Sequence, residues 1–222
     1  MNSVLYEYPS QAAFNRVVPK TKIYAYGKPG RKIREQLVSQ VNQIVWQYKL
    51  SPETINLPAR SGVLEIQIFR ISLKTGEFHE DIMRCIDKVV AFPIFFELIY
   101  NSKIKLMATY KRPNETDSSK CVVDNYFKTD WLPEDTQRSP LPVSLNMAGL
   151  YEQMLQQLIP LPPRKEEPLK EHVARMNEIR SKEIERDKID VCLKKEIQFN
   201  RKVDINRQLR EINKELKALQ RK

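Results

Sequence analysis

Two acidic residues in strongly apolar segments are the first candidates for chemistry. Glu65 opens a Glu-x-Gln pattern in the segment 63–74, and Glu97 lies in IFFELIY, residues 94–100. An ionised carboxylate in such a strand is costly unless it is paired or binds a metal ion. Two such carboxylates on adjacent strands around a divalent ion are what a metal-dependent nuclease requires.

The sequence lacks two features that nuclease cores of this kind share. Those cores carry Glu-x-Lys, whereas Gln67 occupies the position of the lysine here. They also place a hairpin before the acidic strand, whereas we expect a helix before that strand in this chain. An edge strand or a solvated sheet face explains Glu65 and Glu97 equally well. We therefore favour a protein that is not an enzyme, and we predict no metal and no cofactor. A divalent-metal nuclease using Glu65 and Glu97 is kept as the alternative.

Other chemical signatures are absent from the sequence. It contains no GxGxxG, GxSxG or HExxH motif, and GKPGRK at 27–32 lacks the spacing of a phosphate-binding loop. The 5 Gly, 3 Cys and 2 His leave little material for phosphate cradles or metal sites. His79 precedes two acidic residues, but neighbours in a helix point in different directions, so we interpret it as a solvated helix end.

The charge distribution points to acidic partners. The chain of 222 residues carries a net charge of +10, with +6 in residues 1–50, −2 in 51–163 and +6 in 164–222. Basic surfaces attract nucleic acids or acidic proteins, and they also serve solubility and protect sheet edges. The candidates for nucleic-acid contact are Lys103, Lys105, Lys111, Arg112 and Lys120 on one sheet face, with Arg31, Lys32, Arg201 and Lys202.

The cysteine pattern and hydropathy favour the cytoplasm. Cys85, Cys121 and Cys192 are far apart and form no CxxC, which suggests reduced thiols. We find no signal-peptide pattern and no apolar run of the ~18–20 residues that span a bilayer. We therefore expect a cytoplasmic protein that does not bind membranes.

Residues 1–160 are expected to form one α+β domain with an antiparallel-rich mixed sheet of four or five strands and three packed helices. Apolar residues at helical spacing predict the helices, and alternation predicts the strands. A phase slip at 68/69 indicates a bulge or burial of both strand faces. The expected helices are 31–49, 77–90 and 145–159, and the expected strands are 63–74, 94–100, 103–111 and 121–128, with a possible short strand at 21–26.

A proline-rich spacer, residues 161–168, precedes a charged helical arm at 169–222. The end of the arm has a coiled-coil seam, but the register fails upstream, so we expect a coiled coil or a helical hairpin. A polar residue at a seam can fix the choice of partner, and surface asparagines are the ordinary alternative. The docking candidates are Phe199, Asn200, Ile205, Asn206, Leu209, Ile212, Leu216 and Leu219.

Four blocks together resemble the bacterial domain-of-unknown-function family 4391. They are WQYKLSPETINLP (46–58), TYKR (109–112), KTDWL (128–132) and KKEIQFNRKVDINRQLR (194–210), in the family's order. The resemblance covers about residues 4 to 219, and it implies no catalytic residues, because none are established for the family. It implies an accessory role in restriction or phage defence, because the family's members are often encoded beside DNA methyltransferases and helicases.

We therefore expect a non-catalytic accessory protein that docks through its C-terminal arm. The expected partner is a helicase or methyltransferase subunit, with non-specific DNA contact through the basic ends. Self-association through the arm, as a purely structural coiled-coil homodimer, is the other alternative.

Overall fold

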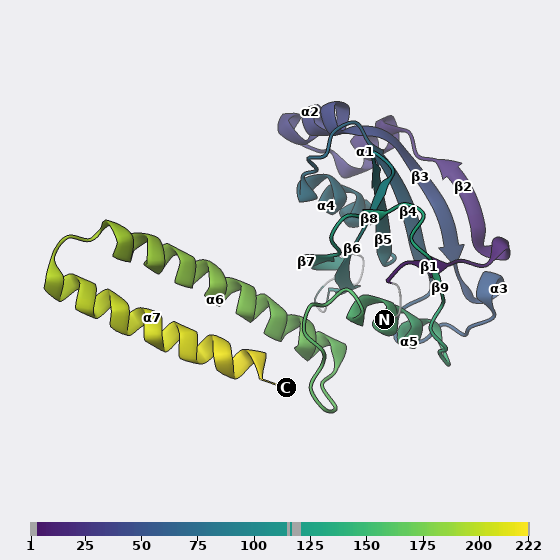
Figure 1. Ribbon diagram of the computed structural model, residues 1–222. Helices are drawn as coiled ribbons and strands as arrows, with labels where there is room; N and C mark the ends of the chain where they lie inside the picture. Colours follow the sequence, from purple (N-terminus) through teal and green to yellow (C-terminus); the bar gives the residue numbers. More distant parts are fainter. Residues whose placement is uncertain (1–3, 115, 117–120, 222) are drawn as a thin grey trace. The chain divides into compact units, whose positions relative to one another are not determined.

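The computed structural model of the protein describes residues 4–114, 116 and 121–221 (Figure 1). The described chain divides into two compact units, Met1–Pro160 and Leu161–Lys222. The first unit is a mixed α+β domain and the second is a pair of helices, as the sequence predicts for the fold class.

The described residues of the first unit build a seven-stranded sheet in which six strands run in the order β2-β3-β4-β5-β6-β7 and β8 pairs with β6. Only β4 and β5 pair in parallel among the described strands of this sheet. The strands are β2 (Ala13–Val17), β3 (Val41–Leu50), β4 (Ile66–Leu73), β5 (Ile94–Tyr100), β6 (Lys103–Pro113), β7 (Cys121–Lys128) and β8 (Leu132–Pro133). A separate parallel ladder joins β1 (Tyr6–Glu7) to β9 (Ser139–Pro140).

Helices pack on both faces of this sheet (Figure 1). One face is covered by α1 (Lys20–Gly27), α2 (Arg31–Gln40) and α4 (Glu80–Val89). The opposite face carries α5 (Met147–Gln156), whose Tyr151 ring meets Phe95 of β5 edge-on. The short helices are η1 (Ser10–Ala12) and α3 (Pro52–Ile55).

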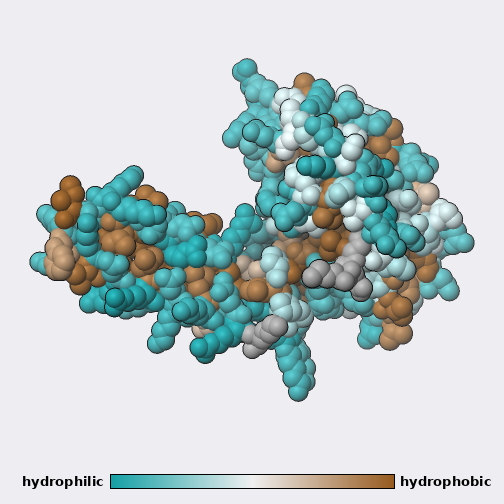
Figure 2. Space-filling model, viewed as in Figure 1, coloured by the Kyte–Doolittle hydropathy of each residue, from teal (hydrophilic) through white to brown (hydrophobic). Residues whose placement is uncertain are grey.

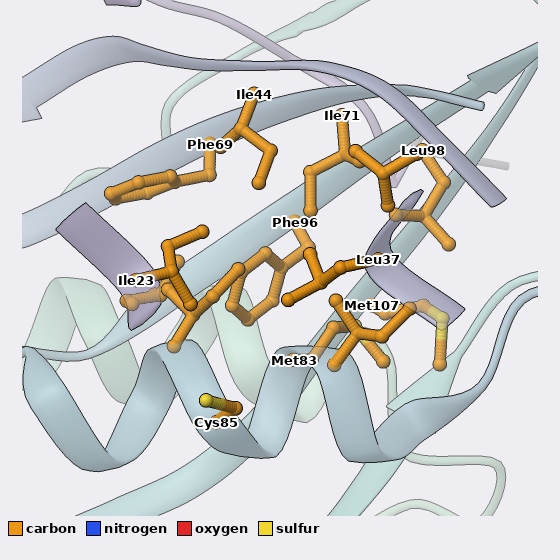
Figure 3. Packing of buried hydrophobic residues seen from close by; sticks show 14 of the residues in the cluster. Ile23, Leu37, Ile44, Phe69, Ile71, Met83, Cys85, Phe96, Leu98 and Met107 are labelled. Carbon is orange, nitrogen blue, oxygen red and sulfur yellow. The ribbon is translucent and has the colours of Figure 1, made fainter. Parts of the chain in front are cut away.

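The main hydrophobic core lies between the sheet and α1, α2 and α4 (Figure 3). Ile23 from α1, Leu37 from α2 and Met83 from α4 meet Phe69 and Phe96 of the central strands. These side chains are buried, and burying one large apolar side chain contributes roughly 1.5–3 kcal/mol. The core thus fixes the central strands that position the polar residues of the other face.

The predicted hairpin of residues 94–111 is confirmed, with β5 and β6 antiparallel in register from Phe95–Ala108 to Tyr100–Lys103. Asn101 and Ser102 form its turn with φ of 46° and 56°. Positive φ at both central residues is typical of a two-residue type I′ turn, which matches the right-handed twist of the strands. The predicted helices 77–90 and 145–159 and the strands 63–74 and 121–128 are also confirmed within a few residues.

The predicted helix 31–49 is wrong beyond Gln40, because residues 41–50 form β3. Val41, Ile44 and Tyr48 fit a helical period, but the segment is rich in β-branched and aromatic residues that favour strands. In the fold it pairs with β4 on one side and β2 on the other. The pairing overrides the local periodicity.

The possible strand at 21–26 is also wrong, because these residues belong to α1. Ile23 is the buried residue of that helix and packs into the core beside α4. The phase slip in β4 reflects burial of both strand faces, since Ile68 and Phe69 are both buried. The register irregularities lie instead in β3, beside Val41 and Trp46.

The second unit is a helical hairpin of α6 (Leu169–Lys195) and α7 (Phe199–Gln220) (Figure 1). Ile179 of α6 packs against Ile212 and Leu216 of α7 in its buried cluster. Lys182 and Glu215 form an ion pair of 2.7 Å across the two helices. The hairpin interpretation of the arm is therefore confirmed.

In the described part of the chain, no helix has the length and apolar character needed to cross a membrane.

Candidate functional site

A polar cavity of about 530 Å³ lies on the sheet face opposite α1, α2 and α4. Its floor comes from neighbouring positions on the central strands, because Arg70 of β4 pairs in register with Glu97 of β5. Its rim comes from β1 and from the segment between β8 and β9. The lining residues are Tyr6, Glu7, Tyr8, Gln47, Tyr48, Arg70, Glu97, Glu134 and Arg138.

Two ion pairs join the floor of the cavity to its rim. Arg138 binds Glu97 through two hydrogen bonds, Nη1 to Oε1 at 2.7 Å and Nη2 to Oε2 at 3.2 Å. Burial alone would lower the pKa of the Arg138 guanidinium, but the bonds and the charge of Glu97 raise it above its usual value. Arg70 pairs with Glu134 through a single hydrogen bond, from Nη2 to Oε1. Both guanidinium groups are therefore neutralised by a carboxylate.

Three buried polar atoms that belong to residues lining this cavity have no hydrogen-bond partner in the described part of the protein. They are the hydroxyl oxygens of Tyr6 and Tyr8 and Oε1 of Gln47. Burial raises the pKa of Tyr6 to about 12 and raises that of Tyr8 well above its usual value, so both hydroxyls keep their protons. Buried polar atoms are nearly always paired, so these three groups are suited to bind water or a ligand.

A second polar cluster lies inside the core of the first unit. The Lys111 ammonium of β6 donates to the Asp87 carboxylate at 3.2 Å, to the carbonyl of Asp87 at 2.6 Å and to that of Val90. The hydroxyl of Tyr126 donates to the other carboxylate oxygen. Burial raises the pKa of Asp87 and lowers that of Lys111, and the attraction between the two opposes both shifts.

The cluster is structural, because every group in it is used within the protein. All three ammonium protons of Lys111 have acceptors, two of which are carbonyls at the C-terminal end of α4, where a cation is favourable. The hydroxyl of Tyr151 also bonds to β6. It accepts from Lys111 N and donates to Thr109 O, at the point where the register between β6 and β7 shifts. The hydroxyl thus replaces the ladder bonds that the irregularity removes.

Lys111 was a candidate for nucleic-acid contact, and this prediction is wrong because only 5% of the residue is exposed. The predicted basic sheet face is not an open surface, since α4 covers it around Lys111. Lys105 lies over the Trp131 ring at 4.9 Å, and burial lowers its pKa. Lys103, Arg31, Lys32, Arg201 and Lys202 are exposed, Arg112 is partly exposed, and Lys120 lies outside the described residues.

The structure does not bring Glu65 and Glu97 together. Glu97 pairs with Arg70, five residues along β4 from Glu65, a separation of roughly 16 Å at about 3.3 Å per residue. Glu65 accepts from Gln67 Nε2 at 2.5 Å and pairs with Lys49 at 3.2 Å. The strand β3 pairs antiparallel with β4 and precedes it in the chain, where the sequence predicts a helix.

The two carboxylates also do not share a cavity. Glu97 lines the polar cavity, whereas Glu65 does not. Gln67, which is bonded to Glu65, lines an apolar cavity of about 300 Å³ on the sheet face that α1 and α4 cover. Among the described residues, no three His, Cys, Asp or Glu side chains gather into a group that could hold a metal ion. The geometry thus gives no shared centre for Glu65 and Glu97.

The helical hairpin uses part of the predicted docking seam for itself. Ile212 and Leu216 are buried against α6, and Leu219 packs partly against the same cluster. Ile205 and Leu209 are half-buried, and Asn206 is exposed with its amide bonded to the carbonyl of Lys202 at 2.9 Å. The seam therefore pairs the two helices of one chain.

Among the described residues of the hairpin, four of the five large apolar side chains that are exposed lie near the turn that joins α6 and α7, and the fifth, Ile184, lies in the middle of α6 (Figure 2). Ile197 is 90% exposed and Phe199 is 78% exposed, with Val191 and Val203 exposed on the adjoining turns. We call these four residues the hairpin tip. Exposed Asn200, Arg201 and Lys202 follow it at the start of α7. An apolar centre with a charged rim is typical of a protein-binding surface.

The other end of the hairpin is held by two arginines. Arg175 forms a two-bonded ion pair with Glu167, at 2.7 and 2.8 Å, and also donates to the carbonyl of Leu219. Arg164 donates to the carbonyls of Ala218, Leu219 and Arg221 at the end of α7. Cations at a helix C-terminus donate to its last carbonyl groups and interact favourably with the negative end of the helix dipole.

The Glu167–Arg175 pair should make the hairpin sensitive to acid. The hydrogen bonds from Arg175 lower the pKa of Glu167 from 4.5 to about 2. The stabilisation is therefore complete above about pH 4.5 and is lost as the pH falls towards 2. We expect Glu167→Gln to lower the thermal stability at pH 7 and to weaken its dependence on pH between 5 and 2. Circular dichroism melting curves test this, and identical pH dependence in the two proteins would contradict it.

Most of the polar cavity could not be identified from the sequence. Glu97 gave a signal, because a carboxylate in IFFELIY needs a partner. Its partner Arg138 stands 41 residues away in a proline-containing loop, and Tyr6 and Tyr8 come from the other end of the domain. No motif links positions so far apart in the chain.

The fold and the site define a class: an α+β domain with a polar cavity, followed by a helical hairpin with an apolar tip. The family model for "Domain of unknown function (DUF4391)" matches residues 7–216, so the chain belongs to this family. No curated protein and no solved structure matches the chain.

Proposed function

We propose that this protein is a non-catalytic accessory protein that docks onto a larger partner through the hairpin tip. The partner is a subunit of a DNA methyltransferase–helicase assembly of the restriction or phage-defence type. The protein acts in the cytoplasm, with basic surfaces facing DNA.

The observation that supports this proposal is the hairpin tip. Ile197 and Phe199 are large apolar residues left exposed in a unit whose own core uses other residues, Ile179, Ile212 and Leu216. Aromatic residues at the centre of an interface contribute a large share of its binding energy. The seam of α7 is covered by α6, which favours a partner at the tip over a coiled-coil homodimer along the seam.

The choice of partner rests on charge and on the family resemblance. Residues 164–222, which comprise the hairpin and the end of the spacer, carry 18 basic and 12 acidic side chains, which favours an acidic protein surface or DNA. The resemblance implies an assembly that contains DNA methyltransferases and helicases. This association is contextual, so it supports the class of partner and not a particular contact.

Co-purification tests the docking. The tagged full-length chain is expressed in its native cells, and the proteins retained by the wild type are compared with those retained by Ile197→Asp with Phe199→Asp. We expect the wild type to retain a methyltransferase or helicase subunit that the tip variant loses. Equal retention by both proteins would contradict docking through the tip.

DNA contact through the start of α7 makes a separate prediction. Replacing Arg201 and Lys202 with glutamate should weaken binding to a labelled duplex and reduce the slope of log K against log salt by about 2, since each phosphate contact contributes about 0.9. The control, Lys214→Glu with Lys217→Glu, changes the same charge near the other end of α7. Fluorescence anisotropy over a range of salt measures both, and equal losses in the two variants would argue against a local DNA contact.

A further inference from the structure

The polar cavity of the first unit has no role in the docking function. We propose that it binds a nucleobase, as a free nucleoside or as an unpaired base of a single strand. This inference does not depend on the proposed docking function, because the cavity and the hairpin tip belong to different units.

The three unpaired polar atoms set the hydrogen-bonding requirement of the ligand. The hydroxyls of Tyr6 and Tyr8 each offer a donor, and Oε1 of Gln47 offers an acceptor, all without a partner among the described residues. Tyr6 is only 2% exposed, so its hydroxyl has lost most of its access to bulk water. A ligand that fits these groups carries both acceptors and donors, as the edge of a nucleobase does.

The charges of the lining favour a neutral ligand. Two guanidinium groups, Arg70 and Arg138, face three carboxylates, those of Glu7, Glu97 and Glu134. An inorganic anion would meet an excess of negative charge. A metal cation would have to displace Arg138 from the two hydrogen bonds that it makes with Glu97. A neutral molecule avoids both costs.

An aromatic wall favours a planar ligand. Tyr8 and Tyr48 both line the cavity, and their ring centroids lie 4.7 Å apart. Bases stack on tyrosine rings in many nucleic-acid complexes, because every base has a π face. The volume of about 530 Å³ falls in the range of about 300–1,000 Å³ that is usual for small-molecule sites.

Isothermal titration of the full-length protein tests this inference. The probes are adenosine, guanosine, cytidine and thymidine, a single-stranded oligonucleotide containing all four bases, the same sequence as a duplex, and inorganic phosphate. We expect saturable binding of at least one nucleoside or of the single strand, and none of phosphate. Binding of the single strand but not of the nucleosides or the duplex would identify an unpaired base as the ligand.

Two variants separate binding from structure. Tyr6→Phe and Gln47→Met each remove a polar atom that has no hydrogen-bond partner among the described residues. Each should weaken ligand binding about tenfold, while the melting temperature of the protein stays the same or rises. The control Tyr26→Phe removes an exposed hydroxyl on α1 and should change nothing. Because the two substitutions lie in different strands, one remains informative if the other fails to fold.

The proposal is overturned if neither nucleosides nor the single strand bind saturably, or if phosphate binds as well as they do. It is also overturned if both variants bind with the affinity of the wild type.

Discussion

Replacing Lys111 with methionine is expected to lower the free energy of unfolding by about 3–5 kcal/mol, as removal of one partner from a buried ion pair does. Methionine fills a similar volume but leaves the Asp87 carboxylate buried without its ammonium partner, with the hydroxyl of Tyr126 and the charge of Arg84 still acting on it. Two carbonyls at the end of α4 also lose their donor. Urea unfolding followed by circular dichroism measures the loss.

The pH dependence distinguishes an uncompensated charge from a packing defect. Without Lys111, the largest effect that opposes the burial of Asp87 is gone, and the hydrogen bond from Tyr126 and the charge of Arg84 oppose it less strongly. The pKa of Asp87 therefore rises further than in the wild type, and the folded variant favours the protonated carboxyl more. The contribution of Asp87 to the stability of the variant is then highest below about pH 4 and falls as the pH rises through the raised pKa. Relative to the wild type, the variant should therefore be less destabilised at pH 5 than at pH 8.

The double variant Lys111→Met with Asp87→Leu is the control. It removes both charges, and replacing a whole buried pair with apolar groups is often close to neutral. It should recover most of the stability that the single variant loses. A double variant as unstable as Lys111→Met alone would show that shape, and not charge, dominates this site.

Replacing Ile197 and Phe199 with aspartate is expected to weaken docking to the partner by at least about 30-fold, which corresponds to about 2 kcal/mol. Both side chains are exposed, so the change should leave the melting temperature of the protein unaltered. The purified partner, titrated against immobilised wild-type and variant proteins, gives the two affinities.

A matched control exists in the first unit. Val143 is 94% exposed and Leu145 is 87% exposed, and neither belongs to the hairpin. Aspartate at both positions introduces the same charge and removes similar apolar surface. Partner affinity close to that of the wild type is expected for this control, whereas a comparable loss would point to a general effect of charge.

The elements predicted correctly are those whose local pattern agrees with their tertiary role. The β5–β6 hairpin joins two alternating strands through Asn101 and Ser102, and α4 has its apolar residues on one face. In each case the period, the turn and the buried face indicate the same structure.

The wrong predictions occur where pairing with residues distant in the sequence determines the structure. Residues 41–50 carry a helical period, but their neighbours β2 and β4 supply the hydrogen bonds that make them a strand. Lys111 looks like one more lysine of a basic row, because its partner Asp87 is 24 residues away and belongs to a helix. Local pattern contains no information about either partner.

The polar cavity could not be predicted for the same reason, because its residues come from distant parts of the chain. Arg70 and Glu97 become neighbours only through strand register, Gln47 lies at a register shift of β3, and Arg138 reaches Glu97 from a loop. The sequence shows that Glu97 needs a partner, but it does not show which one. Of the hairpin tip, the sequence singled out Phe199, which interrupts a charged segment close to where the register of the arm changes. It did not single out Val191, Ile197 or Val203, because their exposure depends on the turn between α6 and α7.

The central claim, docking through the hairpin tip, is tested most directly by photo-crosslinking in native cells. A photoreactive phenylalanine analogue is placed at position 199 of the tagged full-length chain, and at position 143 as the control. Docking predicts a crosslinked product from position 199 that contains a DNA methyltransferase or helicase subunit and that is missing from position 143. Products that contain only a second copy of this chain, or the same products from both positions, would contradict it.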